Sequence, residues 1–248
     1  MTCMWSVVYK EDFNMILILC AIEFEMKPFL KALENTRKEK CESLVVHYGT
    51  INGTSVMVVR CGVGLERAAA ATQTLISILD ISRVVMSGTA GGVETNLKLG
   101  DTIISEELLY HDGRAKSLQK NEIFNKDTAF KADKTLLISI RKAVENNQFS
   151  QAIYFGRIAS GNKFVTRKMF SKIAEKYRAF CVDMETAAVA HVCAINDIPF
   201  IAVRSVTDTS EKSGILNFYK NVTLAANNSF AVVVKLLNEL EKEQGELA

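Results

Sequence analysis

Continuously apolar runs alternate with amphipathic segments along nearly the whole chain. The first run, residues 15–22, predicts a buried strand. Residues 23–34 after it have helical periodicity, with Pro28 near the first turn, where a missing N–H costs least. The same order then repeats. We expect further strands at 83–87, 101–110, 151–160, 179–183 and 199–205, and further helices at 66–79, 133–147, 167–177, 184–196 and 218–240.

One part of the chain departs from this alternation. Two β-prone runs, 47–50 and 55–60, flank the pair Asn52-Gly53, and Asn-Gly between such runs is the strongest short signal for an antiparallel hairpin. Elsewhere, strands separated by helices indicate a parallel sheet covered on both faces. We therefore expect an α/β fold of three layers, αβα, around a central mixed, largely parallel twisted sheet.

The chain contains no linker rich in Pro, Gly or Ser, so residues 15–248 are expected to form a single domain. Residues 1–14 precede it as an extension whose role the sequence does not indicate. Apolar residues make up 48% of the 248 residues, which is ample for a core covered on both sides.

Composition excludes several classes of function. The 30 basic and 28 acidic residues are interspersed, so we expect no binding of nucleic acid or of an anionic membrane. No apolar run approaches the about 18 residues of a membrane span, and Glu23 and Glu25 directly follow the first run, unlike a signal peptide. Six scattered cysteines lack C-x-x-C spacing, and three histidines lie far apart. We therefore expect no metal and a reducing, cytoplasmic location.

Glycine or acidic residues follow five of the expected strands, in segments 20–25, 60–64, 87–92, 182–185 and 204–208. Ligands bind at the carboxyl ends of strands in this fold class, so these segments form the candidate site. Taken singly, each has a simpler interpretation. The acidic residues before helices suit the stabilisation of helix N-termini, residues 88–92 suit a turn, and Asp208 suits a cap in a polar turn.

In combination, the segments resemble the bacterial methylthioadenosine/S-adenosylhomocysteine nucleosidases of the nucleoside phosphorylase superfamily, over nearly the whole chain from Met15 onward. Members typically show G-A-M-E-E-E, N-T-G-S-A-G-G, V-E-M-E-A and R-x-I-S-D, in this order. The corresponding segments here read C-A-I-E-F-E at 20–25, M-S-G-T-A-G-G at 86–92, V-D-M-E-T at 182–186 and R-S-V-T-D at 204–208. Four matches in order are far more specific than any one of them.

The resemblance implies hydrolysis of the N-glycosidic bond of methylthioadenosine and S-adenosylhomocysteine, without a cofactor. Glu25 would activate the water, and Asp208 would protonate N7 of the departing adenine. Adenine leaves poorly as an anion and the ribose becomes oxocarbenium-like, so this pair follows the logic of inverting glycoside hydrolysis. Glu185 would bind the ribose 2′- and 3′-hydroxyls, with Met184 beside the sugar.

The resemblance also implies the other walls of a nucleoside pocket, and a homodimer. Phe164 would stack on adenine, and the backbone of Val165 would read its edge. Tyr110 and His111 match a loop that approaches the neighbouring subunit's site. The remaining substrate-binding positions would be Val63, Thr89, Ala90, Gly91, Arg204 and Phe218.

Three residues depart from the family pattern, although no proposed catalytic carboxylate is lost. Asn162 stands where S-G-D-x-F has aspartate, Phe24 is the middle residue of the first motif, and Thr207 precedes the late aspartate. Phosphorolysis is an alternative, but the arginine usual in phosphorylases before the central motif is Met86 here. An aminodeoxyfutalosine hydrolase would share nearly all these residues, and a non-catalytic nucleoside-binding module would keep the same fold.

Overall fold

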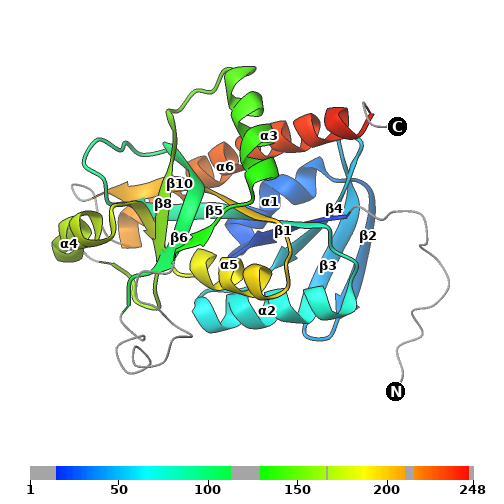
Figure 1. Ribbon diagram of the computed structural model, residues 1–248, viewed down its shortest axis with the longest axis horizontal. Coiled ribbons are helices and arrows are strands. Elements are labelled where there is room, and N and C mark those ends of the chain that lie inside the picture. The colour runs from blue at the N-terminus through cyan, green and yellow to red at the C-terminus, as the bar shows by residue number, and fades with distance from the viewer. Residues whose placement is uncertain (1–14, 113–128, 166, 210–214, 246–248) are drawn as a thin grey trace.

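Helices cover both faces of one mixed sheet in the computed structural model, which describes residues 15–112, 129–165, 167–209 and 215–245 (Figure 1). The helices are α1 (Glu23–Ala32), α2 (Leu65–Ile78), α3 (Lys134–Glu145), α4 (Arg167–Tyr177), α5 (Thr186–Ile195) and α6 (Ile215–Gly245). α1 and α3 pack with α6 on one face, and α2 packs with α5 on the other. The expected α/β architecture with a mixed sheet is confirmed.

Ten strands make up the sheet among the described residues. They are β1 (Ile16–Cys20), β2 (Glu34–Cys41), β3 (Leu44–Ile51), β4 (Thr54–Arg60), β5 (Arg83–Gly92), β6 (Thr102–Tyr110), β7 (Phe130–Lys131), β8 (Ile153–Ser160), β9 (Ala179–Asp183) and β10 (Phe200–Thr209). One part runs in the order β2-β3-β4-β1-β5. In the other, β5, β10, β6, β8 and β9 pair in a closed ring, because β5 pairs with both β10 and β9.

The apolar run at the start of the chain is the centre of the core. All five residues of β1 are fully buried, because the strand lies between β4 and β5 and has apolar residues packed on both faces. The predicted hairpin is also confirmed. β3 and β4 pair antiparallel, and Asn52 and Gly53 at the turn both have positive φ, 49° and 88°, as a tight two-residue hairpin loop requires.

One predicted boundary is wrong, and one strand was missed. α1 ends at Ala32 rather than at residue 34, and residues 34–41 form β2, which the sequence did not predict. This strand has one neighbour, β3, and its side chains are mostly exposed. An edge strand of this kind carries charges and lacks the alternation of apolar and polar residues that marks a half-buried strand.

The simpler interpretation of residues 88–92 as a turn is also wrong, because β5 continues as strand through Gly92 beside β10. The glycines serve a different need. A Cβ on Gly88 would lie 2.4 Å from a guanidinium nitrogen of Arg204 and 2.5 Å from a carboxylate oxygen of Glu25. Gly88 is therefore required for close approach of these two side chains.

The extension of residues 1–14 lies outside the described residues, and the single domain over 15–248 stays a prediction. Across the described ranges, no helix has the length and apolar character needed to cross a membrane.

Candidate active site

A cavity of about 430 Å³ opens where β1, β5, β9 and β10 end. Its walls come from segments far apart in the sequence: the start of α1, the end of β5, the loop after β8, the start of α5, the end of β10 and the start of α6. Most of the residues predicted from the sequence line it, namely Glu25, Val63, Thr89, Ala90, Gly91, Phe164, Val165, Met184, Glu185, Asp208 and Phe218.

Glu25 connects α1 to β5. Its Oε2 accepts hydrogen bonds from the backbone N–H groups of Ala21 (2.8 Å) and Ile22 (3.2 Å), the reach-back contact typical of an acidic residue in a first helical turn. Its Oε1 accepts from both the N–H and the hydroxyl of Thr89, each at 2.8 Å. All four contacts are donors, and an ionised carboxylate is a pure acceptor. Helix capping is thus the role of one oxygen only.

Arg204 lies behind the cavity lining and gathers three acidic side chains. It is fully buried, its Nε donates to the Thr186 hydroxyl at 2.9 Å, and the same nitrogen lies 2.8 Å from Oδ2 of Asp183 as an ion pair. Nη2 lies 3.4 Å from Oε2 of Glu185, and Nη1 lies 3.8 Å from Oε1 of Glu25. Burial by itself lowers the pKa of Arg204. The three acidic side chains raise this pKa by more than burial lowers it, so the net shift is upward. Arg204 is therefore a permanent buried cation that serves as the shared counter-charge of these acidic side chains.

Asp183 and Glu185 have the same sequence context but different environments. Asp183 accepts from the backbone N–H groups of Glu185 (3.3 Å) and Thr186 (3.2 Å), so it stabilises the start of α5 as the capping interpretation predicts. Glu185 makes no such bond, and its Oε1 accepts instead from the N–H of Gly64 at 2.9 Å. Burial raises the pKa of Glu185 to about 8, against the lowering effect of Arg204. The capping interpretation is wrong for Glu185.

Asp208 reaches the cavity because β10 is irregular at this point. The expected polar turn is absent, since β10 continues to Thr209, but its register with β5 shifts between Val206 and Asp208. Such a bulge redirects a side chain. The Thr207 hydroxyl lies 2.9 Å from Oδ1 of Asp208, to which it can donate. Asp208 and Glu25 are both 3% exposed and line the same cavity.

The mouth of the cavity is apolar, in contrast to its floor. Phe24, Val63 and Phe164 are each close to half exposed, and Ile215 and Tyr219 are both 61% exposed. Exposed apolar groups gathered at one opening are characteristic of a binding site.

Several lining residues were not predicted, namely Lys163, Phe170, Ile215 and Tyr219, and Phe24 was noted only as a departure. A signal for two of them exists in the sequence. Ile215, Phe218 and Tyr219 have the i, i+3, i+4 spacing that places side chains on one face of a helix.

Tyr110 and His111 do not line the cavity. The Tyr110 ring is 36% exposed and contacts Phe130 and His191 edge-on, each with ring centroids 6.1 Å apart. The His111 ring is buried and lies against Gly161, where a Cβ would come within 2.5 Å of it.

Within the described ranges, His, Cys, Asp and Glu side chains form no group of three or more that could hold a metal ion. Among the described residues that line the cavity, Lys163 is the only cation. Four buried carboxyl groups line the cavity, Glu25, Asp183, Glu185 and Asp208, and Asp183 is engaged at the start of α5. The chemistry available at the site is therefore that of the other three.

Proteins of known identity are similar to the chain over most of its length. The profile of the Phosphorylase superfamily matches residues 15–238. The chain is 30% identical over 227 residues to the 5′-methylthioadenosine/S-adenosylhomocysteine nucleosidase of Haemophilus influenzae (strain PittEE), with 90% of this chain and 98% of that protein covered.

Crystal structures of nucleosidases of the same name have a similar fold. The one from Colwellia psychrerythraea 34H, in complex with adenine, has a TM-score of 0.83 at 29% identity and covers 91% of this chain and 95% of its own. The one from Neisseria meningitidis, in complex with methylthio-immucillin-A, has a TM-score of 0.82 at 25% identity and covers 90% and 98%.

Proposed function

Because the chain belongs to the 5′-methylthioadenosine/S-adenosylhomocysteine nucleosidases of the phosphorylase superfamily, we propose that it hydrolyses the N-glycosidic bond of adenine thionucleosides. The observation that carries this proposal is that Glu25 and Asp208 line one cavity, which also contains Glu185. The cavity volume of about 430 Å³ falls in the range of small-molecule sites.

Glu25 acts as the base that orients and activates the water. Four hydrogen-bond donors and the nearby Arg204 hold its carboxyl group in one orientation on the cavity wall, and a general base requires such positioning. Asp208 acts as the acid at N7 of adenine. The Thr207 hydroxyl lies 2.9 Å from its Oδ1, and the side chain is buried in the cavity that would receive the adenine.

Glu185 binds the ribose hydroxyls beside Met184. Its carboxyl is held on the cavity wall by the N–H of Gly64 and by Arg204. Phe164 and Val165 supply the adenine wall, and Phe164 is 46% exposed, so ring surface is accessible for stacking.

Hydrolysis is favoured over phosphorolysis by the charges of the cavity. A phosphate nucleophile needs cationic and amide ligands, whereas the described lining offers Lys163 as its only cation. Met86, at the position where the arginine of phosphorylases is expected, is fully buried in the core. An ionised Glu25 would repel phosphate and assist water.

The 5′ substituent lies at the apolar mouth, between Val63 and Phe218. An uncharged thioether matches this surface, because burial of each CH₂ group contributes about 0.8 kcal/mol. The same mouth is open to solvent, which leaves room for a longer substituent.

The decisive assay measures free adenine released from methylthioadenosine by the purified protein, with and without phosphate. We expect release at the same rate in both conditions. Strict dependence on phosphate would mean a phosphorylase, and no release from any adenine nucleoside would mean a binding module. S-adenosylhomocysteine and aminodeoxyfutalosine as substrates identify the preferred 5′ group.

The active form is a homodimer, with Tyr110 at the contact between subunits. Its ring is partly exposed and belongs to an aromatic group with Phe130 and His191. Light scattering of the purified protein measures the mass directly, and a monomer at micromolar concentration would contradict the dimer.

A further inference from the structure

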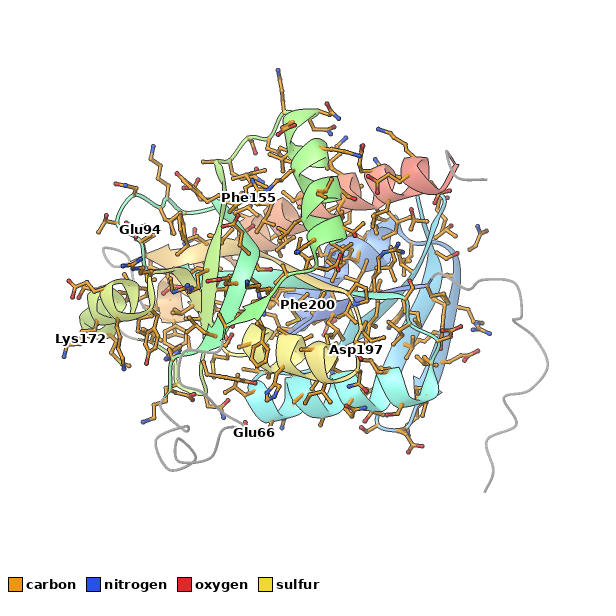
Figure 2. The ribbon with its side chains drawn as sticks, in the orientation of Figure 1. Glu66, Glu94, Phe155, Lys172, Asp197 and Phe200 are labelled. Atoms are coloured by element: carbon orange, nitrogen blue, oxygen red, sulfur yellow. The ribbon has the colours of Figure 1, made fainter. Side chains whose placement is uncertain are left out.

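Two walls of the cavity are joined by a single side chain that does not itself line it. The loop at residues 161–165, after β8, carries Lys163, Phe164 and Val165 into the cavity, and the segment before α2 carries Val63. Oδ1 of Asn162 accepts a hydrogen bond from the N–H of Leu65 at 2.8 Å. Its Nδ2 donates to Oε2 of Glu66 at 2.6 Å. Figure 2 shows Glu66 at the first turn of α2.

The start of α2 lacks a cap from its own segment. Its N-cap is Gly64, which has no side chain, and its φ of 105° is one that other residues rarely adopt. Two distant residues supply the missing acceptors: Glu185 accepts from the N–H of Gly64 at 2.9 Å, and Asn162 from the next N–H, that of Leu65. Asn162 therefore holds the segment that in turn holds Glu185.

The backbone of Asn162 is fixed as well. Its N–H donates to Oδ2 of Asp112 at 2.7 Å, and the N–H of Gly161 donates to the carbonyl oxygen of Asp183 at 3.1 Å. The loop is thus anchored on one side to β9 and on the other, through the Asn162 side chain, to α2. The Asn162 side chain is the contact whose chemistry can be changed without altering the backbone.

Asparagine suits this position because its amide offers an acceptor and a donor at once. An aspartate would retain an acceptor for the N–H of Leu65, but its second oxygen would face the carboxylate of Glu66 where the amide donor now lies. The asparagine that replaces the family's aspartate at position 162 is therefore explained by its hydrogen bond to Glu66.

We propose that Asn162 is a positioning residue, which holds the Phe164 loop against the start of α2 and so sets the affinity for the nucleoside rather than the rate of bond cleavage. The identity of the ligand rests on the proposed function. Asn162 contacts neither the cavity nor the reacting atoms.

The test is a swap between positions 162 and 66. N162D places two carboxylates together, E66Q alone retains an acceptor for the Asn162 amide, and the double variant N162D/E66Q restores one donor and one acceptor. For N162D we expect the KM for methylthioadenosine and the Kd for free adenine to rise about 10-fold, equivalent to about 1.4 kcal/mol. kcat should change by less than about 3-fold, and both E66Q and the double variant should stay within about 3-fold of wild type, since each keeps the pair hydrogen-bonded.

Hydrogen exchange provides a readout that needs no substrate. Peptides covering residues 62–66 and 160–165 should exchange faster in N162D than in wild type and return to the wild-type rate in the double variant. An unchanged KM and exchange rate in N162D, a loss confined to kcat, or a failure of E66Q to rescue N162D would each overturn the proposal. Absence of adenine release by the wild-type protein would refute the proposed function, and the exchange and adenine-binding comparison would still decide the role of Asn162.

Discussion

Replacement of Glu25 by glutamine keeps the shape of the side chain but removes its charge and one of its acceptors. In the more favourable orientation, the remaining oxygen still serves Ala21 and Ile22, and the new NH₂ group faces Thr89. The Thr89 hydroxyl can turn to accept from this group, but the Thr89 N–H then loses its partner. An unpaired buried donor costs about 1–3 kcal/mol, so we expect E25Q to fold with its free energy of unfolding lowered by that amount.

The effect of E25Q on rate should be much larger than its effect on binding. A positioned base contributes about 10²- to 10⁴-fold, so kcat for adenine release should fall at least about 100-fold. This corresponds to about 2.7 kcal/mol in the activation barrier. The Kd for adenine should change by less than about 3-fold, because Glu25 is proposed to contact the water and not the adenine base, so E25Q removes no hydrogen bond to adenine. Chromatography of released adenine and calorimetric titration measure the two quantities.

T89V is the matched control for E25Q. It removes one of the four donors to Glu25 and preserves the carboxylate, the backbone N–H and the shape of the side chain. We expect a loss in kcat of about 10-fold, the size of one hydrogen bond to a charged group. If E25Q retained more than a tenth of wild-type kcat while losing stability, Glu25 would be only a link between α1 and β5, and the reasoning would be refuted.

Three further variants probe the other charged groups. D208N should lose about 10²- to 10⁴-fold in kcat with methylthioadenosine but far less with a p-nitrophenyl riboside, whose leaving group needs no proton; equal losses would contradict the acid role. R204M removes the cation from three buried acidic side chains, so urea denaturation should show about 3–5 kcal/mol less stability, and an unchanged value would contradict its role as their counter-charge. The pKa of Glu185 is raised from its ordinary value of 4.5 to about 8 in the folded protein, so the folded state binds this proton more tightly and loses stability as pH rises through that window. As pH rises from about 5 to about 9, the Tm of wild type should therefore fall relative to the Tm of E185Q. A difference in Tm that stays constant over this range would rule this out.

Local patterns were enough for the elements whose environment is uniform along the segment. The run that forms β1 is apolar throughout because both faces of the strand are covered, and the Asn52-Gly53 turn needs only the conformational freedom of two adjacent residues. The motifs around Glu25 and Asp208 also indicated the family, since their residue types and order can be recognised without coordinates. The alternation of strands and helices predicted an α/β fold for the same reason.

Tertiary structure alone decided how those residues divide their tasks. Asp183 and Glu185 are indistinguishable by context, yet Asp183 accepts from the backbone at the start of α5 whereas Glu185 accepts from Gly64, which a different part of the chain brings to it. The pair Asn162 and Glu66 is separated by 96 residues. Periodicity along a chain reports only on neighbours in sequence, whereas strand pairing and the close approach of buried charges depend on segments brought together by folding. That is why the candidate residues could be named in advance and their contacts could not.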